Sequence, residues 1–197
     1  MKRIPLTLLA IATAILMGCD SKATREAAWQ GEHMLTSPGK TLTMQFGVTP
    51  ESATPTYSLQ FGDKAVILPS AMGFELRGDT QKKEFWNGGD ITSNASEVLP
   101  LNSGFTIKEV KNSTFDDTWT PVWGEESSIR NHYNELLVCM EQEGTGYLMN
   151  IRFRLYDDGL GFRYEFPAQR SLAYFVIKEE RTEFAFTGEH TAFWIPG

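Results

Sequence analysis

Short stretches in which apolar and polar residues alternate recur along most of this chain, and they constrain its fold more than any other feature. In Met149-Asn-Ile-Arg-Phe-Arg-Leu155 every second residue is apolar, as in a strand that buries one face. Residues 41–48 alternate in the same way. A period of two cannot gather apolar residues on one side of a helix, so the pattern predicts half-buried β-strands.

Turn residues separate further strands. Gly62 follows an alternation that ends at Phe61 and leads into a strand over 64–68, while Asp157-Asp158-Gly159 leads into an alternation that ends at Phe166. The other expected strands are one around Phe105 and Ile107 and those over residues 136–140, 174–177 and 182–186. The sequence contains no long amphipathic pattern, repeat or strand–helix–strand unit. We therefore predict an all-β fold, an antiparallel β-sandwich of two packed sheets.

The amino-terminal residues have the features of an export signal. Two basic residues precede an apolar run from Ile4 to Met17, which is too short for a stable membrane-spanning helix but suits a signal peptide. The run ends in Leu16-Met-Gly-Cys19, which resembles a bacterial lipobox. We predict a lipoprotein signal peptide over residues 1–18 and lipid attachment at Cys19. An ordinary secretory signal with an incidental cysteine is the alternative.

The rest of the chain has the size of one domain. Residues 19–32 are expected to form a polar tether, and residues 33–197 the folded β-sandwich. The predicted anchor implies an exported bacterial lipoprotein in the periplasm or at the outer membrane, with the membrane as a partner. The formal net charge of −7 disfavours nucleic acid as a partner.

Cys139 is the only cysteine besides Cys19, and it lies within the apolar run over residues 136–140. A thiol in such a run usually behaves as a small buried hydrophobe. We therefore expect no intrachain disulfide and no catalytic thiol, since a reactive thiol needs an electropositive and partly exposed setting.

The segment over residues 115–135 concentrates aromatic, amide and charged residues in what the sequence suggests is an irregular stretch. Pro121 and Gly124 break helix and strand, so Trp119 and Trp123 are expected on a fixed bend. A pyranose offers an apolar face for stacking and a rim of hydroxyls for hydrogen bonding, and this mixture of residues suits it.

Eight residues of this segment are therefore candidates for substrate binding or for a domain interface. They are Trp119, Trp123, Glu125, Arg130, Asn131, His132, Asn134 and Glu135. In the alternative, structural interpretation, the tryptophans cap one end of the sandwich, Arg130 pairs with a carboxylate and the amides fix the bend. The residues alone leave these two interpretations open.

Other polar motifs favour structural roles. Neighbouring carboxylates on a strand point to opposite faces, so the pairs are not the two carboxyl groups that flank a glycosidic bond, and Asp157-Asp158 is first a turn. These motifs are the acidic pairs at 116–117, 125–126, 157–158 and 179–180, the histidines His33 and His190, and the Asn-X-Ser/Thr triplets at Asn94 and Asn112. The sequence shows no metal-ligand or phosphate-loop spacing.

Several ordered motifs resemble one enzyme family. Trp119-Thr-Pro-Val-Trp-Gly-Glu125 followed by Ile129-Arg-Asn-His-Tyr-Asn-Glu135 is similar to the amino-terminal domain of glycoside hydrolase family 97, the calcium-dependent α-glucosidases and α-galactosidases. Asp158-Gly-Leu-Gly-Phe-Arg-Tyr-Glu-Phe-Pro167, residues 174–177 and Phe193-Trp-Ile-Pro-Gly197 extend the resemblance, which covers residues 35 to 197. It is closest to the starch-utilisation α-glucosidase branch.

The resemblance implies a large two-sheet sandwich like galactose mutarotase. It also implies that the chain is truncated before a (β/α)8 barrel that carries the general acid and base, the sugar subsites and most of the calcium ligands. A calcium-binding glutamate of the amino-terminal domain is expected just after Gly197. The chain itself is thus assigned no catalytic residue and no metal ligand, and calcium is expected only in the parent enzyme.

The expected function is that of a carbohydrate-associated domain of a calcium-dependent α-glycosidase, most consistent with an α-glucosidase acting on maltooligosaccharides. Its partners would be an α-linked oligosaccharide and the catalytic barrel of the same polypeptide, on which it packs and whose active-site entrance it shapes. The fragment alone would be inactive. The alternatives are a stand-alone glycan-binding surface lipoprotein without catalysis, and a scaffold without sugar affinity.

The lipobox predicts the behaviour of one variant. Full-length protein should fractionate with membranes, and Cys19→Ser should release it or leave it unprocessed, because the thiol that receives the lipid is gone. Fractionation and the mass of the mature chain measure both outcomes. A Cys19→Ser protein that is processed normally and stays in the membrane would rule out lipid attachment.

Overall fold

The computed structural model describes residues 29–77, 98–170, 172, 175–191, 193 and 195. Within these residues the chain forms strands and no helix, so the all-β prediction is confirmed. In the same part of the chain no helix is long and apolar enough to span a membrane. The predicted signal peptide, Cys19, most of the tether, Asn94 and Tyr174 lie outside the described residues.

The strands follow one another in chain order. They are β1 (His33–Thr36), β2 (Leu42–Val48), β3 (Pro55–Phe61), β4 (Lys64–Ala71), β5 (Phe74–Arg77), β6 (Val98–Leu101), β7 (Phe105–Trp119), β8 (Ile129–Gln142), β9 (Leu148–Leu155), β10 (Leu160–Glu165) and β11 (Val176–Glu180).

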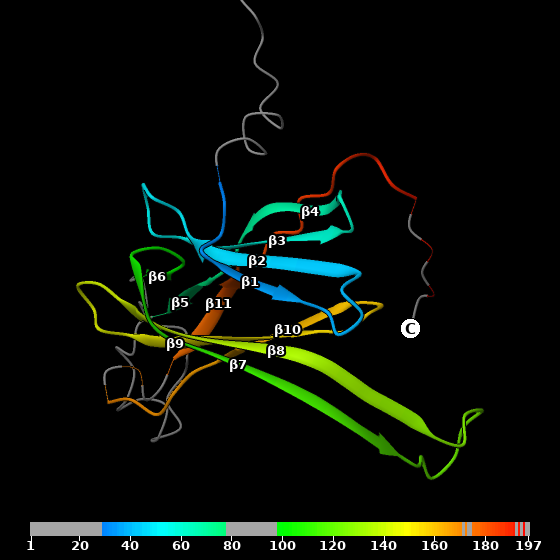
Figure 1. The fold of residues 1–197 in the computed structure, drawn as a ribbon. Helices are drawn as coiled ribbons and strands as arrows, with labels where there is room; N and C mark the ends of the chain where they lie inside the picture. Colours follow the sequence, from blue (N-terminus) through cyan, green and yellow to red (C-terminus); the bar gives the residue numbers. More distant parts are fainter. Residues whose placement is uncertain are drawn as a thin grey trace, which may run out of the picture.

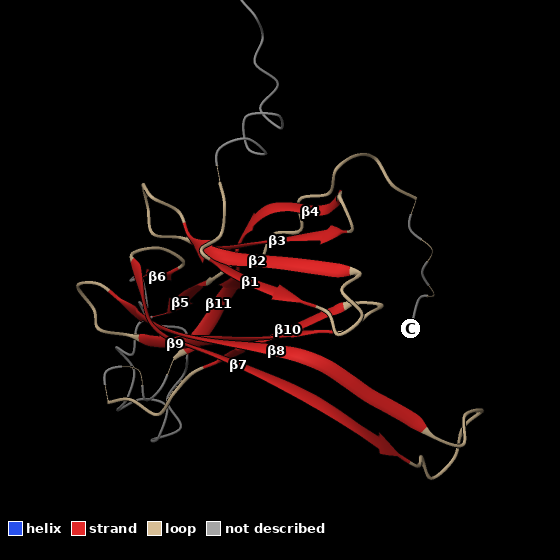
Figure 2. Ribbon diagram, viewed as in Figure 1, coloured by secondary structure: helices blue, strands red, loops and turns tan. Residues whose placement is uncertain are grey.

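Antiparallel pairing arranges these strands in three sheets (Figures 1 and 2). Two four-stranded sheets, ordered β1-β2-β3-β4 and β10-β9-β8-β7, face each other and enclose the core. A third sheet, ordered β11-β5-β6, joins them, and Phe74 on β5 packs edge-on against Tyr164 on β10 at 4.4 Å between ring centroids. The predicted sandwich is therefore confirmed, with one more sheet than the sequence indicated.

The alternating residues form the core because one face of each strand is turned inward. Val138 on β8 lies opposite Ile151 on β9, and both are fully buried. Phe153 reaches across to Phe46 of the facing sheet, with 5.3 Å between ring centroids. Burying a large apolar side chain contributes about 1.5–3 kcal/mol, so this line of contacts between the sheets is a main source of stability.

Two strand predictions near the carboxyl end are corrected. The strand expected over 174–177 is β11, which runs later and includes Glu179 and Glu180. Residues 182–186 form no strand, only a bridge from Phe186 to Ile67. Here Ser70 Oγ accepts a hydrogen bond from the amide of Ala185, so a side chain replaces a backbone partner and the ladder is interrupted.

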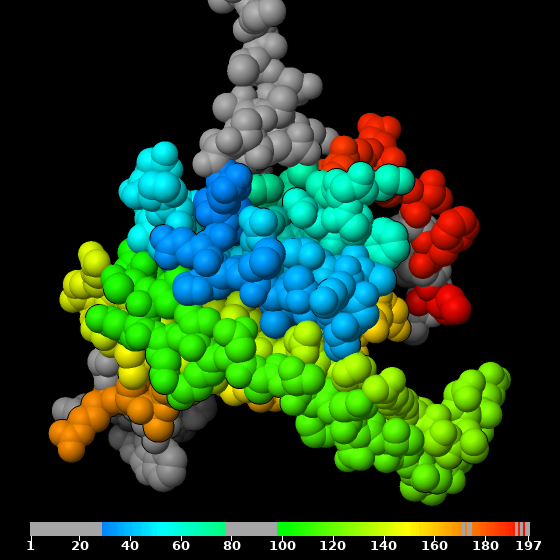
Figure 3. Space-filling model, in the orientation of Figure 1, coloured from blue at the N-terminus to red at the C-terminus, as the bar shows by residue number. Residues whose placement is uncertain are grey.

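The segment over residues 115–135 is mostly regular strand, so the expectation of an irregular stretch is wrong. β7 pairs with β8 from Phe105–Gln142 to Trp119–Ile129, and only residues 120–128 connect them. β9 accompanies β8 no further than the pair Asn134–Leu155. Beyond that pair the two strands run on alone as a ribbon, which leaves the sandwich in Figures 1 and 3.

Removing the Phe153 ring should test the core. Phe153→Ala is expected to lower the free energy of unfolding by about 3–5 kcal/mol, because the ring is fully buried against aromatic neighbours on both sheets. Phe61→Ala is the matched control, since Phe61 is more than half exposed. Urea unfolding of both variants measures the difference, and equal midpoint shifts would contradict the assigned core.

Candidate functional site

Six of the eight candidate residues lie on the ribbon, while Asn134 stands at its start and Glu135 lies one residue before it, where β8 still pairs with β9. Trp119 ends β7, and five candidates follow one another on β8 with Tyr133 among them. Trp123 and Glu125 lie in the connecting loop of residues 120–128. Gly124 has a φ of 143°, which residues with side chains rarely adopt, so glycine is needed at this point of the loop.

Because the side chains alternate, the ribbon has two faces of different chemistry. We call one the aromatic face: it contains the cross-strand pairs Phe115–Tyr133, Asp117–Asn131 and Trp119–Ile129. The other is the polar face, which contains the pairs Thr114–Asn134, Asp116–His132 and Thr118–Arg130. The candidate residues on the strands are thus divided between opposite faces and do not form one cluster.

Charge pairing and an amide anchor occupy the polar face. Arg130 donates from Nε to Asp116 Oδ1 and from Nη2 to Asp116 Oδ2, both at 2.7 Å, and these bonds hold the pKa of the Asp116 carboxyl below its usual value. His132 Nε2 lies 4.0 Å from Asp116 Oδ2. Asn134 donates to the backbone oxygen of Thr36 at 2.8 Å, which ties the ribbon to β1. Arg130 therefore pairs with a carboxylate as the structural interpretation expects, whereas Asn134 bonds to β1 and does not fix the bend.

An aromatic stack holds the root of the aromatic face, where the ribbon leaves the sandwich. Tyr133 is 5% exposed and stacks on Phe115, with ring centroids 5.3 Å apart and planes 19° from parallel. Tyr156 packs against Tyr133 with ring centroids 5.2 Å apart and donates a hydrogen bond to Asn131 Oδ1 at 3.3 Å. Sequence reasoning missed Tyr133 and Phe115, although the spacing of Tyr133 by two residues from Asn131 and Glu135 places it on their strand face.

Glu135 is buried at this root, although it lies on the outer face of its sheet. Its carboxylate accepts hydrogen bonds from Arg152 Nη1 and from Arg154 Nε, the latter at 2.8 Å, and the residue is only 8% exposed. Burial alone would raise the pKa of the Glu135 carboxyl, but the bonds from Arg154 and Arg152 outweigh it and hold that pKa below its usual value. Arg152 also donates to Glu165 Oε1 at 2.6 Å and Arg163 donates to the same oxygen at 2.9 Å, so five charged groups form one network.

The tip of the ribbon stands in solvent. Trp119 is 53% exposed, Trp123 is 88% exposed and Val122 is fully exposed. The tryptophans therefore do not cap the end of the sandwich, and that part of the structural interpretation is wrong. Figure 3 shows the tip standing away from the rest of the molecule.

The carboxylates of the site are not arranged for acid–base catalysis. Asp116 and Glu135 are each held as anions by arginine, whereas a general acid needs a raised pKa. Within the described ranges no three His, Cys, Asp or Glu residues lie close enough together to hold a metal ion. The arrangement can present flat aromatic surface and hydrogen-bonding groups, which is the chemistry of binding.

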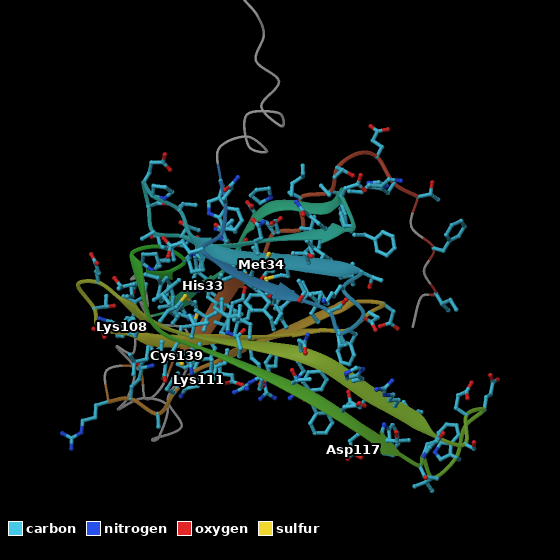
Figure 4. All side chains as sticks on the ribbon, in the orientation of Figure 1. His33, Met34, Lys108, Lys111, Asp117 and Cys139 are labelled. Carbon is cyan, nitrogen blue, oxygen red and sulfur yellow. The ribbon has the colours of Figure 1, made fainter. Side chains whose placement is uncertain are left out.

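The remaining predicted residues lie elsewhere. Cys139 is half-buried rather than buried, because its side chain is on the outer face of β8, and burial raises the pKa of its thiol (Figure 4). His33 is half-buried on β1, while His190 is exposed with Nε2 3.4 Å from Thr187 Oγ1. A hollow of about 600 Å³ lies beside β11 and β5, where Arg181 and Lys178 pair with Glu75, and no candidate residue lines it.

Comparison with known proteins agrees with the resemblance found in the sequence. The family profile described as "Glycosyl-hydrolase 97 N-terminal" matches residues 35–197. A glycoside hydrolase family 97 enzyme from Pseudoalteromonas sp. strain K8, solved in complex with acarbose, is 32% identical with a TM-score of 0.67; the match covers 84% of this chain and 22% of that chain. A variant of that enzyme in complex with panose gives the same identity and coverage with a TM-score of 0.66.

A crystal structure of a β-arabinopyranosidase shares the fold at 22% identity, with a TM-score of 0.62 over 79% of this chain and 21% of that chain. The chain thus spans about a fifth of the length of the solved structures that it matches. The family profile matches residues 35–197, a region that contains both the sandwich and the ribbon.

The charge network predicts a pH-dependent effect of Glu135→Gln. Since the folded-state pKa of Glu135 is lowered, its contribution to stability is present above its unfolded pKa of about 4.3 and is lost as pH falls through the folded value. At pH 7 the variant should be less stable by about 1–3 kcal/mol, and this difference should shrink below about pH 4. Urea unfolding at several pH values measures it.

Glu141→Gln is the matched control, because Glu141 pairs with Lys108 on an exposed surface. An exposed pair contributes about 0–1 kcal/mol, so this variant should change little at any pH. A Glu135→Gln effect no larger than that of Glu141→Gln would show that the network does not hold the ribbon root.

Proposed function

This chain belongs to glycoside hydrolase family 97, as the amino-terminal domain of such an enzyme, and from this membership we propose that its parent protein is a calcium-dependent α-glucosidase. The parent would use water to cleave α-glucosidic bonds in maltooligosaccharides. In this proposal the domain packs on a catalytic (β/α)8 barrel of the same polypeptide and shapes the entrance to its active site.

The substrate class rests on the ligands of the solved relatives. The Pseudoalteromonas enzyme was solved with panose, an α-linked glucose oligosaccharide, and with acarbose, a mimic of such oligosaccharides. At 32% identity over 84% of this chain, this pair of complexes is the observation that carries the proposal. It favours an α-glucoside over an α-galactoside.

The described residues support a role in binding and positioning rather than in bond cleavage. Asp116 and Glu135 are bonded to arginines that hold the pKa of each carboxyl below its usual value, whereas the general acid of a glycosidase needs a raised pKa. We therefore place the general acid and base in the rest of the parent polypeptide. The ribbon, with Trp119 and Trp123 exposed near its tip, would reach toward that catalytic part.

Calcium is proposed for the parent and not for this chain. Among the described residues no three His, Cys, Asp or Glu side chains lie close enough together to hold a metal ion. The ligands would come from the remainder of the parent. Lipid attachment at Cys19 and a location in the periplasm or at the outer membrane remain part of the proposal on sequence grounds alone.

A stand-alone glycan-binding lipoprotein is the second candidate function. The exposed side chains of Trp119 and Trp123 favour it, since flat aromatic faces in solvent are suited to stacking on sugar rings. The two proposals differ in the reading frame that they expect beyond codon 197. A long frame with alternating strands and helices means an enzyme, and a stop codon means a binding protein.

Hydrolysis by the complete gene product tests the enzymatic proposal. It should release p-nitrophenol from p-nitrophenyl α-glucoside, and chelation with EDTA should abolish most of this activity, with recovery on adding Ca²⁺ but not Mg²⁺. Residues 20–197 alone should release none, because the acid and base are elsewhere.

A mock preparation from cells without the gene is the control for contaminating glucosidase. Turnover by residues 20–197 that survives repurification would show that the active site lies within this domain. No turnover by the complete product, together with calorimetric binding of maltotriose, would replace the enzyme by the glycan-binding alternative.

A further inference from the structure

The aromatic face of the ribbon exposes several apolar side chains, which we call the aromatic strip, and the polar pair Asp117–Asn131 lies among them. Phe115 is 41% exposed, Trp119 is 53% exposed and Ile129 is 38% exposed, and all three lie on the same side of two paired strands. Val122 and Trp123 in the adjoining loop extend the apolar surface to the tip. A group of large exposed apolar side chains such as Trp119, Ile129 and Trp123 on a folded domain marks an interaction site more often than an incidental feature.

A two-stranded ribbon without a covering layer is only marginally stable in water. Here the polar face supplies little apolar burial, since Asp116 and Arg130 satisfy each other in solvent. The ribbon nevertheless leaves the sandwich in a fixed direction, because Tyr133 is buried in its stack and Asn134 is bonded to Thr36. A surface that is uncovered and already held in one conformation suits docking, because association then costs little conformational entropy.

We propose that the aromatic face docks onto the part of the parent polypeptide that follows this domain, while the polar face stays in water. This inference rests on the proposed function for the existence of that part, and it names the surface through which the two parts meet. The aromatic strip would form the apolar centre of the interface, and the charge network around Glu135 its polar rim.

A covalently linked partner is favoured over a separate protein. The chain covers only 22% of the solved relatives with which it shares 32% identity, so those proteins contain extensive chain outside this domain. In Figure 1 the red stretch that follows β11, up to residue 191, runs on the same side of the view as the ribbon tip. A domain continuing from there would have a high effective concentration beside the ribbon.

A sugar fits the aromatic face less well than protein does. Recognition of a pyranose needs several free donors and acceptors around the ring. On this face the strands provide only the pair Asp117–Asn131, and the Asn131 oxygen already accepts a bond from Tyr156. The hydrogen-bonding groups of the ribbon are gathered on the polar face, which points away from the exposed aromatic side chains.

Hydrogen exchange on the complete gene product, followed by mass spectrometry, tests the proposal. Docking should slow exchange of the amides in residues 115–131 well below the rate of unstructured peptide. Trp119→Thr should speed this exchange by about tenfold or more, because it removes the largest side chain of the strip from the interface. Thr118→Val is the matched control: it lies one residue away on the polar face and should leave exchange unchanged.

Amides of β9 report whether each variant is still folded, since β9 is the buried centre of its sheet. Fast exchange of residues 115–131 in a complete product whose β9 is protected would overturn the proposal, as would equal effects of Trp119→Thr and Thr118→Val. If protection of residues 115–131 depends on protein concentration, the aromatic face binds a second copy of the chain. If it requires added maltotriose, the face binds sugar. Either result would overturn the proposal.

Hydrolysis of p-nitrophenyl α-glucoside on the same sample separates this inference from the proposed function. An unprotected ribbon in an active enzyme would refute the docking surface alone. A protected ribbon in a product without hydrolytic activity would refute the α-glucosidase alone and leave the docking surface in place.

Discussion

The long antiparallel pairing of β7 with β8 is the constraint on which the rest of the structure depends. The register shifts once, between Ile107 and Glu109, and then stays constant from Glu109 beside the core to Trp119 in solvent. The same alternation that buries Val138 therefore also decides which side chains of the ribbon point outward. A shift of the β7–β8 register by one residue would exchange the residues of the aromatic and polar faces of the ribbon. Packing of the core, which fixes this register, therefore also determines which side chains the ribbon exposes.

Electrostatics at the junction reinforce this geometry. Glu135 lies on β8 near the point where β9 ends its pairing with that strand. Two arginines of β9, Arg152 and Arg154, form ion pairs with its carboxylate. A buried ion pair is weak support for stability, but removing one partner leaves a charge without compensation. The network therefore contributes mainly to the specificity of the fold. It disfavours any arrangement in which β8 and β9 are not paired beside Glu135.

Sequence reasoning succeeded where packing decides the structure. The strands β2, β3, β9 and β10 are recognisable from alternation, because each buries one face in the core, and part of β8 is recognisable from its apolar run over residues 136–140. It failed for the strand expected over residues 182–186, where Ser70 interrupts the ladder, and for the segment around Trp119, where strand continues without a core to bury. Pro121 and Gly124 do break the strands, but only within a short loop. The sequence indicated that Arg130 would pair with a carboxylate. It could not indicate that the partner is Asp116, because the register between two strands is not visible in one sequence.

The division of the candidate residues between two faces changes how their chemistry should be understood. As a sequence segment, the tryptophans, Arg130 and His132 look like one binding site, since they are close along the chain. In the ribbon, Trp119 and Arg130 lie on opposite faces, and Arg130 is already paired. A ligand that contacts the aromatic strip cannot at the same time use these polar groups, so the two faces must have different partners. The aromatic strip is held in place by the charge network around Glu135 at the start of the ribbon. Such a rigid apolar surface suits an interface between two parts of one enzyme better than it suits a sugar-binding pocket.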